Sequence, residues 1–269
     1  MSDFTTPAPW DDWRRATPAR IALGRAGAGM PTDETLRFGW AHAMARDAIH
    51  AALDAPALAA TLQAQGWQVA HARSRAPDRA TYLRRPDLGR QLDADDAQRL
   101  RDAPGGGPVD VCIVIGDGLS SLAIERQAAP LLAALQPLLP SEWRLAPVVI
   151  ATQARVALAD EIAELFGARL SVMLIGERPG LSSPDSLGLY LTHGPRRGRH
   201  DAERNCISNV RPEGLSYDAA AFRLVWLMRE ALRRGLSGVE LKDQSELAVL
   251  GDAGVPGLSS APARPTDTR

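Results

Sequence analysis

Two short polar segments carry the side chains best suited to bind a ligand or react with one. The first is Gly176-Glu177-Arg178-Pro179-Gly180, which follows an apolar run, and the second is Arg204-Asn205-Cys206-Ile207-Ser208-Asn209. An open α/β sheet keeps its ligand site at the carboxyl ends of its strands, where each strand opens into a turn. The first segment therefore fits the rim of a site for a large polar ligand. It also fits an ordinary surface turn, and the sequence leaves both interpretations open.

Cys206 in the second segment is a candidate nucleophile. A lone cysteine is more often a small buried hydrophobe, and a reactive thiolate needs a base, for which His193 and His200 are the nearby candidates. Both histidines border a Gly/Arg-rich stretch that we expect to be a mobile loop, so a Cys-His dyad is the less favoured interpretation. The sequence contains no H-E-x-x-H, G-x-S-x-G or clustered metal-ligand motif. We therefore expect no catalytic residue and no metal site in this chain.

A third segment, Gly116-Asp117-Gly118, follows a predicted strand. One interpretation is that it receives a phosphate or a ribose at the N-terminus of the next helix. It lacks the GxxxxGK[ST] pattern and the full GxGxxG pattern, so the motif is unspecific. A tight turn with a capping aspartate explains it equally well, and both explanations stay open.

The elements that must position these segments alternate between strands and helices. The apolar patterns predict strands at 67–72, 109–115, 143–151, 170–175 and 187–192, and helices at 32–53, 56–65, 95–102, 124–138, 156–166 and 217–234. We expect 73–93 to be irregular and Cys206 to lie in a loop. This alternation predicts an α/β fold with a Rossmann-like, mostly parallel sheet flanked by helices.

The composition shifts along the chain predict four parts. These are a flexible N-terminal arm (1–16), a small helical N-terminal domain with a connecting segment (17–104), the Rossmann-like domain (105–250) and a disordered tail (251–269). Trp10 and Trp13 in the arm need an apolar surface, which either this chain or a partner chain can provide.

The overall composition excludes several classes of protein. The 269 residues are 45% hydrophobic and 23% charged with a net charge of −1, as in soluble globular proteins and unlike nucleic-acid binders. The two cysteines lack C-x-x-C spacing, which argues against a disulfide framework or a structural zinc site. No apolar run reaches the roughly 20 residues of a membrane span, and no secretory h-region is present. We expect a soluble protein of the reducing cytoplasm that binds neither membranes nor nucleic acid.

Several motifs in combination resemble one known family, the small (light) subunit of ethanolamine ammonia-lyase. The resemblance spans about 17–242 and rests on Thr17-Pro18-Ala19-Arg20-Ile21, Gly24-Arg25-Ala26-Gly27, Gly116-Asp117-Gly118-Leu119-Ser120, Leu174-Ile175-Gly176-Glu177-Arg178-Pro179-Gly180-Leu181, Asn205-Cys206-Ile207-Ser208-Asn209 and Ser237-Gly238.

The resemblance implies an adenosylcobalamin-dependent lyase that converts ethanolamine to acetaldehyde and ammonia by a radical mechanism. It implies a large TIM-barrel subunit with the substrate site and the catalytic residues, and a small subunit that closes over the cobalamin at the interface. The family's cobalamin contacts fall on Val156, Glu177 and Cys206. Binding is expected to be base-on, since D-x-H-x-x-G is absent. The resemblance also implies ethanolamine catabolism by a hetero-oligomer with several copies of each subunit, in a bacterial microcompartment or otherwise in the cytoplasm.

The predicted elements agree with these three contacts. Val156 opens a helix after one strand, Glu177 ends the next strand and Cys206 follows later, so all three can meet at one edge of the sheet. Val156 suits the apolar face of a corrin, and Glu177 can accept hydrogen bonds from its peripheral amides. Two other hypotheses remain. One is an independent Rossmann-like enzyme with a nucleotide at 116–118, and the other is a purely structural partner that binds no ligand.

Overall fold

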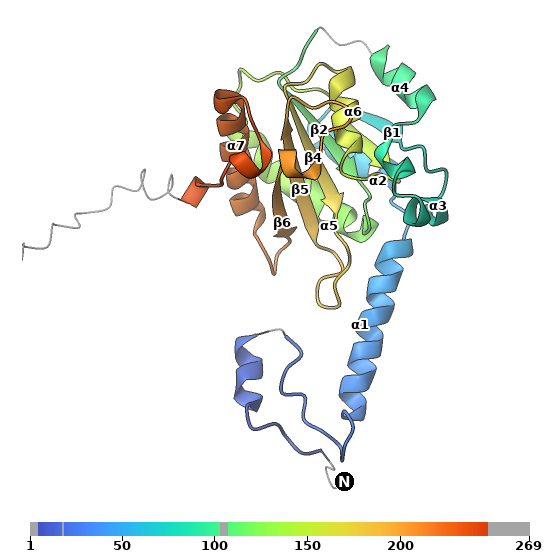
Figure 1. Ribbon diagram of the computed structural model, residues 1–269, viewed down its shortest axis with the longest axis vertical. Coiled ribbons are helices and arrows are strands. Elements are labelled where there is room, and N and C mark those ends of the chain that lie inside the picture. Colours follow the sequence, from blue (N-terminus) through green and yellow to red (C-terminus); the bar gives the residue numbers. More distant parts are fainter. Residues whose placement is uncertain (1–4, 18, 103–106, 247–269) are drawn as a thin grey trace, which may run out of the picture.

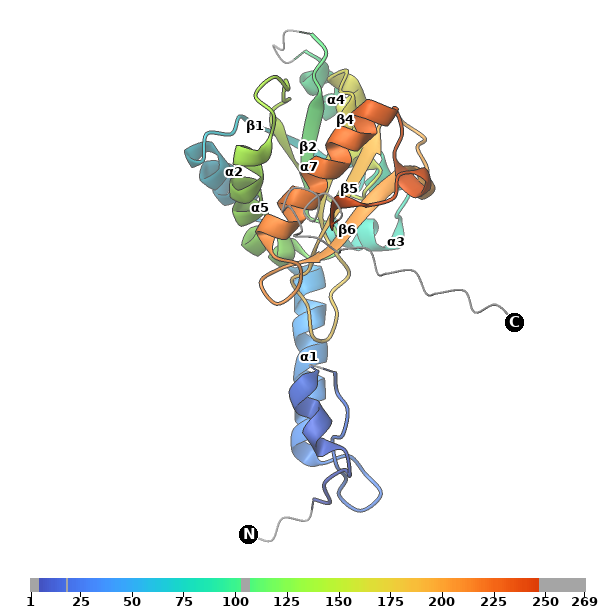
Figure 2. The ribbon, with the colours of Figure 1, turned by 90° about the vertical axis from the view of Figure 1, so that its left-hand side faces the viewer.

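A six-stranded sheet lies between two layers of helices, and one long helix projects from it (Figures 1 and 2). This computed structural model describes residues 5–17, 19–102 and 107–246. The predicted tail at 251–269 lies outside the described residues.

Six strands and seven α-helices alternate along most of the described chain. The strands are β1 (Val69–Arg73), β2 (Val111–Gly116), β3 (Val148–Thr152), β4 (Leu170–Gly176), β5 (Leu187–His193) and β6 (Arg204–Val210). The α-helices are α1 (Thr32–His50), α2 (Ala55–Ala64), α3 (Arg79–Arg84), α4 (Ala94–Arg101), α5 (Ser121–Leu135), α6 (Leu158–Leu165) and α7 (Tyr217–Arg234). Short 3-10 helices include η1 (Asp11–Ala16) and η2 (Leu88–Arg90).

The sheet has the order β1-β3-β2-β4-β5-β6. The pairs β1–β3, β2–β3 and β2–β4 are parallel, whereas β4–β5 and β5–β6 are antiparallel. The predicted α/β fold is confirmed, and the sheet is mixed because β5 and β6 reverse direction at one side. The prediction that Cys206 lies in a loop was wrong, because Cys206 is in the edge strand β6 and pairs with Tyr190. The segment 73–93, expected to be irregular, contains α3 and η2.

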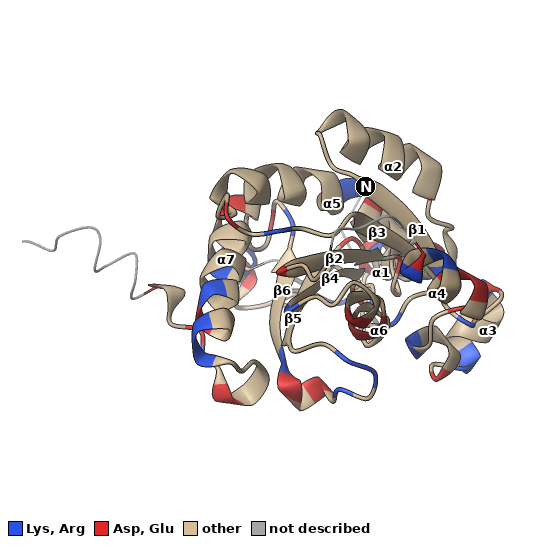
Figure 3. Ribbon diagram, turned by 90° about the horizontal axis from the view of Figure 1, so that it is seen from above, with Lys and Arg blue, Asp and Glu red and all other residues tan. Residues whose placement is uncertain are grey.

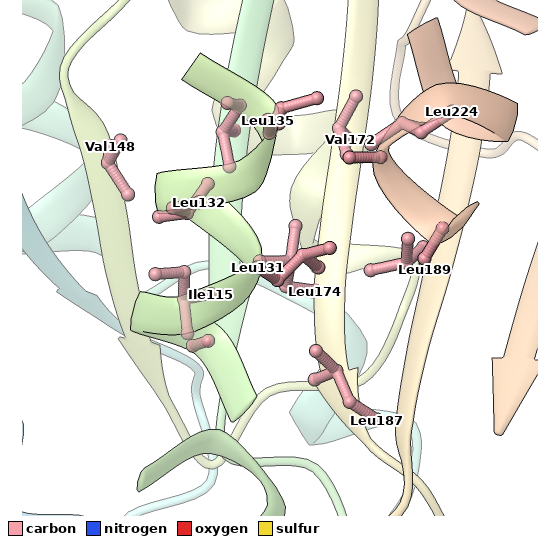
Figure 4. Close-up of a cluster of buried hydrophobic side chains, with 14 of the residues drawn as sticks. Ile115, Leu131, Leu132, Leu135, Val148, Val172, Leu174, Leu187, Leu189 and Leu224 are labelled. Carbon is pink, nitrogen blue, oxygen red and sulfur yellow. The ribbon is translucent and has the colours of Figure 1, made fainter. Parts of the chain in front are cut away.

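Alternate residues of the strands point into two separate cores. On one face α2, α5 and α7 pack against side chains such as Ile115, Val172 and Leu189 (Figure 4). On the other face α4 and α6 pack against Val114, Met173 and other alternating side chains. Strands β2 and β4 are buried along their whole length. An unbroken apolar run is what a strand covered on both faces requires.

The outer helices follow from their sequences. Helix α7 begins where the Ser216 side chain accepts a hydrogen bond from the backbone N–H of Ala219 at 3.4 Å, and it ends at Gly235 with a φ of 71°. Its charged residues lie on the outer side, whereas α2 carries no Lys, Arg, Asp or Glu (Figure 3). The amphipathic pattern predicted for 217–234 is therefore confirmed.

Helix α1 extends away from the sheet, and the N-terminal segment runs back beside it (Figures 1 and 2). The large side chains of Trp13, Leu36 and Trp40 are 70%, 68% and 70% exposed. Arg14 of η1 donates to Glu34 of α1 at 2.8 Å, and this ion pair links the two segments. No helix in the described ranges is long and apolar enough to cross a membrane.

Candidate functional site

A cavity of about 410 Å³ lies at the carboxyl ends of β2, β3 and β4. The helices that follow β2 and β3, α5 and α6, pack on opposite faces of the sheet. The connections after these neighbouring strands therefore diverge, and such a divergence creates the ligand crevice of open α/β sheets. The side chains that line the cavity include Tyr82, Arg155, Val156, Glu177, Arg178 and Tyr190.

The turn that carries Val156 is held by a buried carboxylate. Asp117, which is 4% exposed, accepts hydrogen bonds from the backbone N–H groups of Gln153 and Ala154, each at 2.9 Å. Gln153 has a φ of 53°. A non-glycine residue is strained in this left-handed region, so surrounding contacts must hold it there. Burial raises the pKa of Asp117, and the N–H donors together with Arg79 oppose that rise.

Tyr82 forms the wall beside Val156 and is fully buried. Its ring lies between two guanidinium groups, with the Cζ atoms of Arg79 and Arg155 at 4.7 and 4.2 Å from the ring centre. Its hydroxyl donates to the Ala154 carbonyl at 3.1 Å, and burial raises the pKa of Tyr82 to about 12. Such cation–π contacts contribute roughly 0.5–2 kcal/mol each. Tyr82 thus links α3 to the turn before Val156 through these contacts with Ala154 and Arg155.

Arg79 links this cluster to two other parts of the chain. Its Nη1 donates to the Gly118 carbonyl at 2.8 Å and lies 3.6 Å from the Asp117 carboxylate. Its Nε donates to the Ile49 carbonyl, near the end of α1, at 2.6 Å. The end of the projecting helix is therefore joined to the turn that follows β2.

Glu177 follows β4 and lines the cavity opposite this cluster. Its Oε2 accepts hydrogen bonds from the Ser186 hydroxyl and from the backbone N–H of Asn209, the latter at 3.3 Å. A Cβ at Gly188 would lie 3.0 Å from Oε1, so this glycine leaves room for the carboxylate. The side chain is therefore held in one place while it remains half-buried at the cavity.

Two glycines let the turns after β2 and β4 meet closely. A Cβ at Gly176 would lie 2.0 Å from the Ser120 carbonyl oxygen, and one at Gly118 would lie 2.3 Å from the Gly176 carbonyl oxygen. Gly118 also has a φ of 57°, which favours glycine. These contacts close the floor of the cavity.

Cys206 is not among the residues that line the cavity, but it lies beside one of them. It pairs with Tyr190 across the β5–β6 ladder, and the side chains interact. Cys206 as a whole is exposed, and partial desolvation of its thiol raises the pKa of that thiol. Burial also raises the pKa of Tyr190. The structure thus places Val156 and Glu177 together at one cavity, with Cys206 on the strand next to it.

The arrangement offers little to a nucleophilic mechanism at Cys206. Within 5–17, 19–102 and 107–246, no hydrogen bond links this thiol to His193 or His200, and the raised thiol pKa disfavours the thiolate. The same part of the chain holds no group of three His, Cys, Asp or Glu residues that could bind a metal ion. The cavity instead combines apolar walls with a fixed carboxylate and two guanidiniums, which suits binding of a large polar ligand.

The segment 116–118 does not act as a helix cap. Ser120 caps α5 by accepting from the N–H of Ala123 at 3.2 Å, while Asp117 turns to the backbone after β3. Ser120 also donates to the Pro184 carbonyl at 2.7 Å, which brings the β4–β5 connection over the start of α5. This closure argues against a nucleotide phosphate at the N-terminus of α5.

The motifs did not reveal the roles of Tyr82, Asp117, Ser186 and Tyr190. Tyr82 lies in the segment 73–93, which was expected to be irregular. Its partner Ala154 is 72 positions away, and Asp117 holds a turn 36 positions away. Contacts of this range leave no local pattern in a sequence.

Comparisons with known proteins agree with the motifs. The family model for the ethanolamine ammonia-lyase light chain matches residues 7–242. A protein of Azotobacter vinelandii called ethanolamine ammonia-lyase small subunit is 60% identical over 94% of this chain and 96% of its own length. A protein of the same description from Ralstonia nicotianae is 57% identical over 91% and 92% of the two chains. The chain therefore belongs to the ethanolamine ammonia-lyase light chain family.

Proposed function

We propose that this chain is the small subunit of an adenosylcobalamin-dependent ethanolamine ammonia-lyase, which converts ethanolamine to acetaldehyde and ammonia. In this proposal the chain forms one wall of the cobalamin site. One observation carries the proposal beyond family membership: Val156 and Glu177 come from turns after different strands and line the same cavity.

The size of the cavity supports a shared site. Pockets for drug-sized ligands measure roughly 300–1,000 Å³, and a corrinoid is larger than such ligands. A cavity of about 410 Å³ can therefore hold only part of a cobalamin. The remainder of the pocket must come from a second chain.

The chemistry of the lining supports a corrinoid. Val156 and Ile175 offer apolar surface to the corrin, and the Glu177 carboxylate can accept hydrogen bonds from the peripheral amides. Cys206 would pack beside the ring, behind Tyr190. The described lining residues include no histidine, in keeping with base-on binding. When bound, the cofactor supplies the radical chemistry, while the residues of this chain orient it and exclude water.

The exposed apolar side chains of the N-terminal part support a partner chain. Trp10, Trp13, Leu36 and Trp40 are all more than half exposed. Large exposed apolar surfaces mark interaction sites in soluble proteins. Because Arg79 joins the end of α1 to Gly118 at the cavity, a chain that covers α1 comes close to the cavity as well.

We propose that this partner is a large TIM-barrel subunit that carries the substrate site and all the catalytic residues. The assembly would be a hetero-oligomer with several copies of each subunit. It would serve ethanolamine catabolism in a bacterial microcompartment or in the cytoplasm.

The proposal can be tested by co-expression with a candidate large subunit, followed by titration with adenosylcobalamin and an acetaldehyde assay. We expect tight corrinoid binding and activity from the pair, and neither from this chain alone. Deamination of ethanolamine by the single chain, or equal activity of the pair with no corrinoid, would overturn the proposal.

Glu177→Ala tests the role of the carboxylate within the pair. Corrinoid affinity should fall about tenfold, as for the loss of charge-assisted hydrogen bonds, while the complex stays assembled. Glu240→Ala removes an exposed carboxylate away from the cavity and should leave the affinity unchanged. Equal retention of cobalamin by wild type and Glu177→Ala would count against this role.

A further inference from the structure

Two guanidinium groups that line the cavity have no carboxylate partner. Arg155 and Arg178 both line it, and within the described ranges neither takes part in an ion pair. Glu177 is the carboxylate among the described lining residues, and Asp117 lies behind the cavity with Arg79 as its counter-ion. The lining therefore carries a net positive charge.

Arg155 is fixed before any ligand arrives. Its guanidinium stacks on the Tyr82 ring at 4.2 Å, and its Nη2 donates to the Tyr82 carbonyl at 3.2 Å. Its backbone N–H donates to the Gly89 carbonyl at 2.8 Å. Its Nε is buried without a hydrogen-bond partner in the described part of the chain. A fixed guanidinium with unused hydrogen-bonding capacity loses little freedom when it binds an acceptor.

Arg178 approaches the cavity from the opposite turn. It follows Glu177 directly, and the backbone N–H of Glu177 donates to the Ser186 carbonyl at 3.0 Å, which fixes this part of the turn. The Arg178 side chain is exposed, and within the described ranges it makes no hydrogen bond or ion pair that would hold it away from the cavity. The two arginines thus face a common space from the turns after β3 and β4.

We propose that Arg155 and Arg178 form a subsite for the phosphodiester of the nucleotide tail of cobalamin. This inference rests on the proposed function. The side chains around a corrin ring are neutral amides, and the phosphodiester of the tail is a permanent anion. Arginine binds phosphate through charge-assisted hydrogen bonds, whereas the Glu177 carboxylate repels it and accepts from amides. The two kinds of group therefore give the cofactor one orientation in the cavity.

The test compares two corrinoids that differ in the tail. Adenosylcobalamin and adenosylcobinamide share the corrin and the adenosyl group, and adenosylcobinamide lacks the phosphodiester. Each is titrated, directly and by competition, into the complex of this chain with its large subunit, for wild type, Arg178→Gln and Arg178→Lys. Arg229→Gln, which removes an exposed arginine on α7 away from the cavity, is the matched control. Complex formation without corrinoid is measured for each variant.

Arg178→Gln should weaken adenosylcobalamin binding about tenfold and adenosylcobinamide binding less than about twofold. Arg178→Lys should recover part of the loss. The dissociation constant of wild type for adenosylcobalamin should also rise more steeply with salt than that of Arg178→Gln.

The inference would be overturned if Arg178→Gln lost equal affinity for both corrinoids or kept the salt dependence of wild type. It would also be overturned if Arg178→Gln no longer formed the complex in the absence of corrinoid. The last result would mean that Arg178 serves a carboxylate of the partner. If the wild-type complex bound no adenosylcobalamin, the proposed function itself would fail, and the two failures are therefore distinguishable.

Discussion

The carboxylate of Glu177 accepts a hydrogen bond from the backbone N–H of Asn209 at 3.3 Å, although 32 positions separate the two residues. Asn209 has a φ of 59°, a left-handed conformation that asparagine tolerates better than most residues. Its backbone is thus turned at the end of β6 so that the N–H meets the turn after β4. The bond joins the two polar segments that carry most of the chemistry in the sequence.

Ser186→Ala should loosen Glu177 without removing its charge. The Ser186 hydroxyl donates to Glu177 Oε2, and Ser186 is buried. Loss of one such hydrogen bond costs about 1 kcal/mol, so corrinoid affinity of the assembled complex should fall about fivefold. Titration of the complex measures this change. Ser141→Ala, at an exposed serine, is the control, and an unchanged affinity for Ser186→Ala would show that Glu177 does not need this donor.

Gly176→Ala should disrupt the floor of the cavity. The added Cβ would lie 2.0 Å from the Ser120 carbonyl oxygen, a backbone atom that cannot move alone. We expect a loss of about 3 kcal/mol or more in the free energy of unfolding, measured by urea denaturation.

Gly39→Ala provides the matched control, because a Cβ there meets nothing within 4 Å in the exposed part of α1. This change should stabilise the chain by up to about 1 kcal/mol, since alanine favours helix more than glycine. Equal effects of the two substitutions would contradict the close contact at Gly176.

The central strands β2, β3 and β4 could be predicted from the sequence because each is an apolar run that helices cover on both faces. The predicted strand at 170–175 and the observed β4 (Leu170–Gly176) differ by one residue. Strand β6 was missed because its pattern is mostly polar. It lies at the edge of the sheet, and Arg204 is buried there by pairing with Asp160, 44 positions away.

The candidate site was predicted only in part for a similar reason. Glu177 could be proposed from its place after an apolar strand, and Val156 came from the family resemblance. The groups that hold them, Asp117, Tyr82 and Ser186, act through contacts between distant turns. A single sequence indicates the residue types but not which distant turns meet.

Arg204 and Asp160 form an ion pair with both side chains 2% exposed. Asp160 also accepts a hydrogen bond from the Ser171 hydroxyl at 3.0 Å. Arg204→Met would leave a buried carboxylate without its counter-ion, and such a loss costs about 3–5 kcal/mol. Urea denaturation should show this loss for Arg204→Met.

The double variant Arg204→Met/Asp160→Leu removes both charges and should recover much of that stability. A double-mutant cycle with Asp160→Leu gives the coupling energy. A coupling below about 0.5 kcal/mol would mean that the pair does not fix β6 against α6.

Cys112 should make the chain less stable as the pH rises above about 9. Its side chain is fully buried in β2, and burial raises the pKa of its thiol from 9.0 to about 12. Between these values the folded chain keeps the proton that the unfolded chain has lost. The contribution of the protonated Cys112 thiol to the free energy of unfolding is therefore complete below pH 9. It decreases as the pH rises towards 12, by up to about 1.4 kcal/mol per pH unit.

Cys112→Val removes the thiol and keeps an apolar side chain in the strand. Urea denaturation under reducing conditions from pH 8 to about pH 10 should show a steeper loss of stability for wild type than for this variant. Because the other titrating groups are the same in both proteins, the difference between the two pH profiles isolates Cys112. Parallel profiles would mean that the thiol ionises equally easily in the folded and unfolded chains, contrary to its burial.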